Sequence, residues 1–386
     1  MKCNIWNKWD PLRVCMLGNS YTPEFFNGVP DKAGDPLKRI CEETLEDLED
    51  FNQVLQDFGV KVLRPKLDST EKFLDNPKSH PRPPSQPRDT QIVLGNTLYI
   101  TGVDHPAIAE CLYDYDSSLV DLRKVTKLLD KDYYNIIAGS DYPEYDEYLE
   151  NYQNSKYFKK EVWQDLQENF SQRYTGFNSA TCFVAGKDLY PDCNDSLPME
   201  EHFPNIDQFR VNTLNMHNTH CDGNFHPIKP GAILSLHDVQ DYAKTFPGWD
   251  VCYLPDQSWN KLSSFWKLKE RNRGKWWVPG EEDNLAFTNF VETWLQEWVG
   301  YVEETVFDVN VLMLDEHHCC LSNLNNEQVN AFLKKHKVEP VYVPWRHRYF
   351  WDGGLHCITF ELYREGIQKD YFPERTAPIT DEGYEW

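Results

Sequence analysis

The chain has 386 residues, of which 40% are hydrophobic and 14% aromatic, a composition typical of a globular protein with a large core. Its formal net charge of -23 argues against partners such as nucleic acid or an anionic membrane, because both require basic surface. No apolar run reaches the roughly 18 residues of a membrane helix, and the first residues lack the apolar region of a signal peptide. We therefore expect a cytoplasmic protein.

The eleven cysteines do not follow a disulfide or zinc pattern. Their number is odd and no Cys-x-x-Cys pair occurs, so we predict reduced, mostly buried thiols. The segment 317–320 (His-His-Cys-Cys) could suggest a metal site. Because neighbouring residues on a strand point to opposite faces, its four side chains do not converge, and we expect no metal there.

A helix followed by a glycine or a short turn and then a strand recurs along the chain. Apolar residues at helical spacing predict an amphipathic helix over 37–58, which Gly59 ends before a strand over 60–63. The same arrangement is predicted for 238–246 with 250–254, and for 326–336 with 338–343.

Short β-rich runs lie between these units and predict an α/β fold. No GxGxxG or Walker sequence follows a strand, so a nucleotide site has no support. Without a clear boundary, we expect a single domain over 1–386. The runs are 14–18, 91–101, 232–235 and 309–314, with a predicted surface loop at 66–87 and an irregular or helical excursion at 133–157.

Polar residues stand where strand ends are expected. Asp89 precedes the apolar strand 92–94, and Asn178 lies in a run of small polar residues before 182–185. Either could be an ordinary turn residue. In an extended segment His220 and Asp222 would share one face, which suits a base beside a carboxylate.

Cys357 is the strongest candidate nucleophile from the residues themselves. It follows Gly353 and Gly354, and glycines let the backbone turn sharply or approach a ligand closely. A buried, inert cysteine is the alternative at this position.

Taken together, these segments resemble the amidinotransferase family over nearly the whole chain. The family implies a five-bladed α/β propeller of ββαβ modules (the pentein fold), with the active site in a central channel. The matching segments in chain order are 9–12 (Trp-Asp-Pro-Leu), 87–89 (Pro-Arg-Asp), 177–188, 220–225 (His-Cys-Asp-Gly-Asn-Phe), 230–235, 310–316 and 353–357 (Gly-Gly-Leu-His-Cys).

The resemblance implies a ping-pong transfer of the amidino group from arginine, or a similar donor, to a primary amine. Asp89 and Asp222 would hold the guanidinium by charge-assisted hydrogen bonds. Cys357 would attack its carbon, and His220 would protonate the leaving amine. Substrate binding would also involve the residues Thr219 and Gly354. Small molecules would be the substrates, no metal or organic cofactor is required, and a homodimer is implied.

The chain departs from the family pattern at two places. Asn178 stands where the family has an acid that orients the catalytic histidine, and Thr181 replaces a second acid. An asparagine can still hold an imidazole in one tautomer. The segment 215–219 and Val239 do not match the glycine-using pattern, so the identity of the acceptor stays open between glycine and another primary amine. The alternatives are a deiminase-type guanidine hydrolase and a catalytically weakened guanidino-binding protein.

Overall fold

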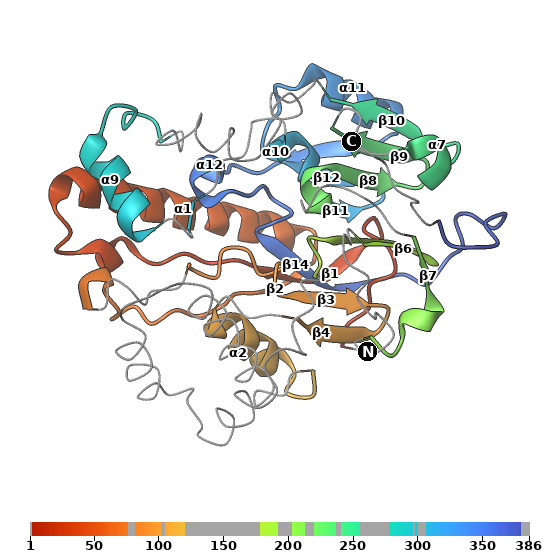
Figure 1. Ribbon diagram of the computed structural model, residues 1–386, viewed down its shortest axis with the longest axis horizontal. Coiled ribbons are helices and arrows are strands. Elements are labelled where there is room, and N and C mark those ends of the chain that lie inside the picture. The colour runs from red at the N-terminus through yellow and green to blue at the C-terminus, as the bar shows by residue number, and fades with distance from the viewer. Residues whose placement is uncertain are drawn as a thin grey trace, which may run out of the picture.

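Helices alternate with short strands in the protein, which confirms the predicted α/β class (Figure 1). Within the described part of the chain, no helix is long and apolar enough to cross a membrane. The computed structural model describes residues 2–75, 82–101, 105–119, 178–191, 203–212, 220–236, 241–254, 278–295, 298–299 and 306–379. The predicted excursion at 133–157 lies outside these residues, and the single domain stays a prediction.

The described strands form five separate sheets of two or three strands, none of which closes on itself. In order, these are β14 (Thr359–Arg364), β1 (Leu12–Leu17) and β2 (Lys61–Leu63); β3 (Gln91–Leu94) and β4 (Thr97–Ile100); β5 (Cys182–Ala185), β6 (Asp188–Pro191) and β7 (Arg210–Val211); β8 (Phe225–Lys229), β9 (Ala232–Ser235) and β10 (Asp250–Tyr253); β11 (Leu312–Asp315), β12 (His318–Leu321) and β13 (Glu339–Tyr342).

Each three-stranded sheet repeats one topology. Its central strand pairs antiparallel with one neighbour and parallel with the other. A parallel pair needs a crossover, and helices supply it between β1 and β2, β9 and β10, and β12 and β13. The helices are α1 (Asp31–Asp57), α2 (Pro106–Tyr115), α7 (Tyr242–Thr245), α9 (Leu285–Trp294), α10 (Val306–Val309), α11 (Glu327–Lys335) and α12 (Arg348–Trp351), with short 3-10 turns η1 (Pro23–Phe26), η2 (Phe73–Asp75), η4 (Ile206–Gln208) and η5 (Cys221–Gly223).

The predicted helix–strand units around α1 and α11 are confirmed, and α7 and β10 form the described part of the third. Helix α1 buries the stripe that includes Leu37, Ile40 and Phe51. It ends before Gly59, whose φ of +74° is a left-handed conformation that glycine adopts without strain.

The β-rich run 91–101 is confirmed as a hairpin of β3 and β4, which turns at Gly95, where φ is +58° and an added Cβ would collide with the ring of Trp6. Two other predicted boundaries were wrong. The run 309–314 begins inside helix α10, so its strand starts only at Leu312. The end of the loop 66–87 is not on the surface, because Ser85 and its neighbours are buried against the end of β1.

The two cysteines of the run 317–320 behave as the strand alternation predicts. Cys319 packs into a core cluster with the apolar face of α11, whereas Cys320 packs into the cluster around α1. No group of three potential metal ligands occurs among the residues that the structure describes.

The two ends of the chain meet in one sheet. Strand β14 pairs antiparallel with β1, with Leu17 opposite Thr359 (Figure 1). The amide of Gly18 also donates to the carbonyl of Ile358 at 2.8 Å. This pairing anchors the segment just before β14, which carries Cys357.

Candidate active site

Cys357 lies in a tight bend between α12 and β14. Asp352 caps α12 in the left-handed region with φ 54°, and two glycines follow it. A Cβ on Gly353 would lie 2.4 Å from Gln86 Nε2, and one on Gly354 would lie 2.7 Å from Asn310 Oδ1. The glycines are therefore required by close packing against these two amides. A substrate contact of Gly354 stays a prediction.

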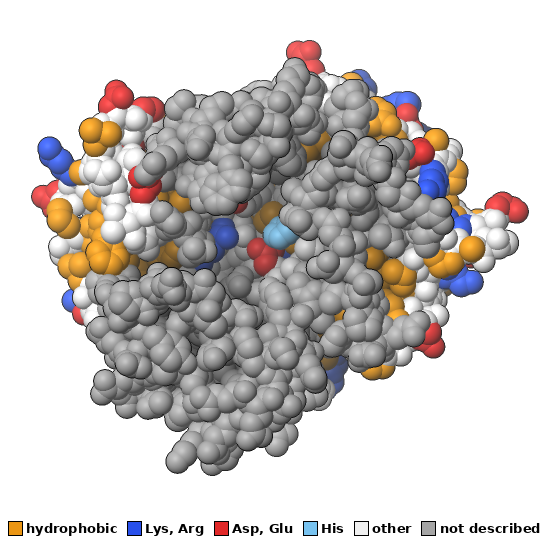
Figure 2. Space-filling view, viewed as in Figure 1, with side chains coloured by type: hydrophobic (Ala, Val, Ile, Leu, Met, Phe, Trp, Pro, Cys, Tyr) orange, Lys and Arg blue, Asp and Glu red, His pale blue; other side chains and the backbone are white. Residues whose placement is uncertain are grey.

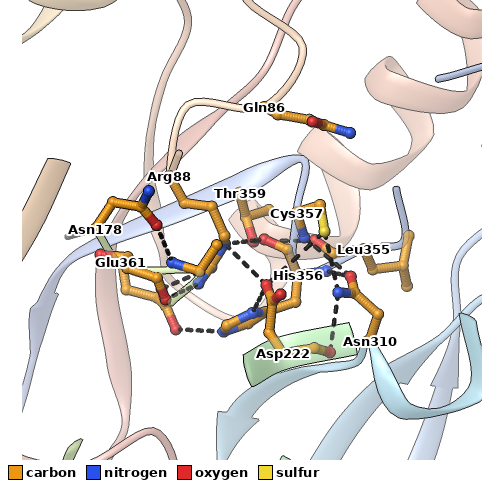
Figure 3. Close-up of polar contacts among 12 residues, drawn as sticks. Gln86, Arg88, Asn178, Asp222, Asn310, Leu355, His356, Cys357, Thr359 and Glu361 are labelled. Carbon is orange, nitrogen blue, oxygen red and sulfur yellow. Dashed lines mark hydrogen bonds and ion pairs between the residues drawn. The ribbon is translucent and has the colours of Figure 1, made fainter. Parts of the chain in front are cut away.

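The thiol of Cys357 faces the carboxylate of Asp222. Their Sγ and Oδ2 atoms lie 3.8 Å apart, and both residues are buried, Cys357 being 8% exposed and Asp222 2% (Figure 3). Burial raises the pKa of the Cys357 thiol well above its usual value, and the charges of Asp222 and Asp89 raise it further. The resting sulfur is thus a neutral thiol at neutral pH.

Asp222 is ionised although it is buried. Burial by itself would raise its pKa, but the hydrogen bond and charge of His356, together with the charge of Arg88, lower it to about 2. Its Oδ2 lies 2.7 Å from His356 Nδ1. Its other oxygen, Oδ1, is shielded from solvent and accepts no hydrogen bond from the described residues.

Asp89 is the second carboxylate near the thiol. Its Oδ1 is likewise shielded and receives no hydrogen bond from the described part of the chain. Burial raises the pKa of Asp89, while the guanidinium of Arg82, and the imidazole of His220 when it is protonated, oppose that rise. Asp89 and Asp222 therefore each present a free acceptor oxygen beside one thiol.

His220 reaches this site by a different geometry from the one predicted. The segment is not extended, because residues Cys221–Gly223 form the 3-10 turn η5 and His220 is its N-cap. His220 is exposed whereas Asp222 is buried, so the two side chains do not share one face as predicted. His220 is nevertheless near the carboxylate pair, because its imidazole, when protonated, acts to lower the pKa values of both Asp89 and Asp222.

Asn178 uses its side chain locally. Its Oδ1 accepts the backbone N–H groups of Ala180 at 2.8 Å and Thr181 at 3.1 Å. The hydroxyl of Thr181 in turn accepts the backbone N–H of Asn178 at 3.0 Å. Among the described residues no hydrogen bond joins Asn178 to His220. The predicted residues Thr219 and Val239 lie outside the described residues.

Four residues that the sequence did not single out complete the site: Arg88, Asn310, His356 and Glu361. His356 bridges the two buried acids, since its Nε2 lies 3.4 Å from Glu361 Oε1. Arg88 is fully buried and its Nη2 donates to Glu361 Oε2 at 2.8 Å, and its Nε donates to the carbonyl of His356 (Figure 3).

Two features of the sequence could have identified three of these four residues. Arg88 and His356 directly adjoin two predicted residues, Asp89 and Cys357. Glu361 is an acid inside the apolar strand β14, and a buried carboxylate in such a strand needs cationic partners. Asn310 begins the segment 310–316, which resembles the family, but nothing local marks its contact with the thiol.

The space-filling view shows a hollow on this face of the molecule (Figure 2). Acidic, basic and histidine side chains are visible inside it. The described surface of the hollow thus offers acidic, basic and imidazole groups to a small molecule.

The arrangement suits covalent chemistry on a cation. A planar guanidinium presents N–H donors in several directions, and two carboxylates with free oxygens can accept them. A neutral thiol next to these acids becomes reactive when a bound cation offsets their charge. The site has the parts for nucleophilic attack on a guanidinium carbon.

Comparison of sequences points to the same chemistry. The chain is 22% identical over 414 residues to the mitochondrial glycine amidinotransferase of Xenopus tropicalis and 22% over 407 residues to that of Gallus gallus. Each alignment covers 95% of this chain and 84% of the relative. No family model matches the chain.

Solved structures agree in fold. The amidinotransferase SxtG of the saxitoxin pathway from Microseira wollei superposes with a TM-score of 0.57 at 18% identity, covering 96% of this chain and 99% of that one. The inosamine-phosphate amidinotransferase of Streptomyces griseus gives a TM-score of 0.54 at 17% identity, with the same coverage. The full-length sequence similarity supports assignment of the chain to the amidinotransferase enzymes, and the solved structures show that it shares their fold.

Proposed function

We propose that the protein transfers the amidino group of arginine, or of a similar guanidino donor, to a primary amine through an amidino-Cys357 intermediate. The observation that carries the proposal is the pair of free oxygens on Asp89 and Asp222 beside the buried thiol. A shielded carboxylate oxygen without a hydrogen-bond donor costs free energy, so a cationic ligand with N–H donors is the natural complement of these two oxygens.

Binding of the guanidinium activates the nucleophile. The negative charges of Asp89 and Asp222 keep the pKa of Cys357 high in the empty site. A bound cation offsets both charges, and the thiol proton passes to His220. The reactive thiolate thus forms mainly when the donor is in place.

The first half-reaction forms a bond from Sγ to the guanidinium carbon. The protonated His220 then gives its proton to the donor nitrogen, the bond from carbon to that nitrogen breaks, and the donor leaves as an amine (ornithine, if the donor is arginine). The amidino group stays on Cys357 as a cation, which Asp89 and Asp222 continue to balance.

The second half-reaction reverses these roles. His220 takes a proton from the incoming ammonium group, and the resulting amine attacks the amidino carbon. The carbon–sulfur bond breaks and the attacking nitrogen gives its second proton to the sulfur, which returns to the thiol. His220 releases the first proton to solvent, and the acceptor carries the guanidino group away. Glycine is the acceptor named for the relatives from Xenopus tropicalis and Gallus gallus, and we propose glycine or another primary amine for this protein.

We also propose a fold for the whole chain. The five sheets and the repeated antiparallel-then-parallel topology support a five-bladed α/β propeller of the pentein type. In that arrangement β14 and β1, from the two ends of the chain, would close one blade.

A mass-spectrometric search for the intermediate tests the proposal. Wild-type protein incubated with arginine and no acceptor should gain about 42 Da, one CN2H2 unit, on the peptide containing Cys357. The adduct should disappear when the correct amine is added, with a new guanidino product formed. Cys357→Ser, which keeps the size of the side chain, should give neither adduct nor product.

Other outcomes would replace this function with a specific alternative. Citrulline as the product would show that water is the acceptor, as in a deiminase-type hydrolase. Tight arginine binding with neither adduct nor product would indicate a guanidino-binding protein, in which Asn178 and Thr181 mark the lost acids.

A further inference from the structure

We propose that Asn310 is an additional catalytic residue, which orients the sulfur of Cys357 and stabilises its thiolate by a direct hydrogen bond. The inference rests on the proposed function, because it concerns the same nucleophile. Asn310 lies between α10 and β11, on a segment separate from both Cys357 and Asp222, and is 1% exposed.

The orientation of the Asn310 amide follows from its partners. Its Oδ1 accepts the backbone N–H of His356 at 3.0 Å and that of Cys357 at 3.0 Å. A backbone N–H can only donate, so the oxygen of the amide must face this bend. The Nδ2 group consequently points the other way, toward the sulfur.

The Nδ2 group has two hydrogens and two acceptors. One acceptor is the carbonyl of Asp222 at 3.1 Å, and the other is Cys357 Sγ at 3.0 Å (Figure 3). The buried amide thus makes four hydrogen bonds and ties the nucleophile to the segment that carries the guanidinium-binding acid. No rotation of the amide would satisfy these four partners equally well.

Gly354 supports the same role for Asn310. A Cβ at Gly354 would lie 2.7 Å from Asn310 Oδ1, 2.8 Å from its Cβ and 2.9 Å from its carbonyl oxygen. Two of these three contacts involve atoms that cannot swing away, so any side chain at position 354 would displace Asn310. The second glycine of the bend is therefore explained by the amide that holds the sulfur.

A neutral donor is the appropriate group at this point. The sulfur must become negative next to Asp222 and Asp89, which both oppose its ionisation. A lysine or arginine touching the sulfur would favour the thiolate but repel the cationic substrate. The amide of Asn310 stabilises the thiolate without adding charge to the pocket that receives the guanidinium.

Alkylation of Cys357 in the absence of substrate tests the inference. Asn310→Asp keeps the shape and the acceptor oxygen but puts a carboxylate oxygen against the sulfur. Because a hydrogen bond to a charged group is worth a factor of about ten to a hundred, the rate of Cys357 modification by iodoacetamide at pH 8 should fall by about that factor. The rate is read from the Cys357 peptide by mass spectrometry across a pH series, where the whole profile should move to higher pH.

Gly354→Ala is the second variant, since it moves Asn310 without changing its chemistry. Like Asn310→Asp, it should lower the rate of Cys357 alkylation. In steady-state kinetics it should lower kcat more than it raises KM. Asn326→Asp is the matched control, because Asn326 Nδ2 also donates to a carboxylate, that of Asp308, at 2.7 Å. That control should leave alkylation unchanged.

An unchanged alkylation profile in both folded variants would overturn the role of Asn310. If Asn310→Asp does not fold, the result for Gly354→Ala decides. The alkylation measurements need no substrate, so their outcome is independent of the search for the amidino adduct. Loss of the adduct in the wild type would refute the proposed function, whereas a normal adduct with unaltered alkylation of the variants would refute only this inference.

Discussion

The acidic residues on the two sides of His356 differ in how completely they are paired. On the inner side, Glu361 is surrounded by cations, with Arg88 at 2.8 Å and Lys8 and Arg364 at 3.4 Å. On the side of the thiol, Asp222 and Asp89 each keep a shielded oxygen that accepts no hydrogen bond from the described residues. Both regions are charged and shielded from solvent, but only one is complete without a ligand.

This difference separates scaffold from binding site. A buried charge is tolerated when it is paired and hydrogen-bonded, and Glu361 meets that condition. The pKa of Glu361 lies well below its usual value, because the neighbouring cations outweigh the burial that would raise it. Asp89 has the opposite behaviour, since burial raises its pKa in the empty site. Incomplete pairing therefore marks the place for a cation.

Removing Glu361 should have the largest effect on stability. Glu361→Ala leaves Lys8, Arg88 and Arg364 facing one another, and breaking a buried pair in this way costs about 3–5 kcal/mol. The urea midpoint of unfolding measures the loss. Glu46→Ala is the control, because the pair of Glu46 with Arg346 is exposed and is worth at most about 1 kcal/mol.

The contribution of Glu361 should also depend on pH. Since its folded pKa is depressed, the stabilisation is present above the unfolded pKa of about 4.3 and is lost as the pH falls toward the folded value. Equal losses of stability for Glu361→Ala and Glu46→Ala would contradict the view that the inner region is a scaffold.

Asp222→Asn should impair both activity and stability, because one oxygen of Asp222 is paired with His356 whereas the other is left for the ligand. Loss of charge-assisted hydrogen bonds to the donor should lower kcat/KM by about a hundredfold to a thousandfold. Its pKa of about 2 means that stability from Asp222 is present above about pH 4 and lost as the pH falls through 2. The variant should therefore be less stable by about 2–3 kcal/mol at pH 7, which differential scanning calorimetry and steady-state kinetics would test together.

Asp89→Asn should lower the activity of the protein while raising its stability. It should lower kcat/KM by about tenfold to a hundredfold, since one guanidinium contact is weakened. Because the folded pKa of Asp89 is raised, its ionised form opposes folding, and any stability it provides is lost as the pH rises through that pKa. The variant should thus melt at a higher temperature than the wild type at pH 7.

A matched exposed change provides the comparison for Asp89. Asp35→Asn on α1 should leave the melting temperature and kcat/KM nearly unchanged, as surface substitutions usually do. If Asp89→Asn were less stable than the wild type, Asp89 would have to be placed with the scaffold instead of the binding site.

Asn178→Asp should have the smallest effect on stability. A carboxylate can accept the same N–H groups of Ala180 and Thr181 that Asn178 accepts now, so the unfolding free energy should change by less than about 0.5 kcal/mol. If Asn178 orients His220, the added charge favours the imidazolium and should raise the transfer rate a few-fold. A rate that stays the same or falls would mean that the asparagine suits the site as it is.

Local sequence determined much of the fold. The spacing of apolar residues and the stop at Gly59 identified α1 and its following strand, and the same reasoning found α11 and β13. These features depend on neighbours within a few residues, which is why they can be predicted from one sequence. The resemblance of several short segments also pointed to Cys357, Asp89 and Asp222, which the structure brings together at one site.

Only the tertiary structure decided how these residues work together. His220 is exposed on a 3-10 turn instead of facing Asp222 along a strand, because the backbone of η5 turns within three residues. Asn310 and Glu361 acquire their roles from partners that lie tens or hundreds of positions away. The hydrogen bonds and ion pairs that join them depend on how α10, β14 and the 82–90 segment pack against one another, and no local pattern encodes that packing.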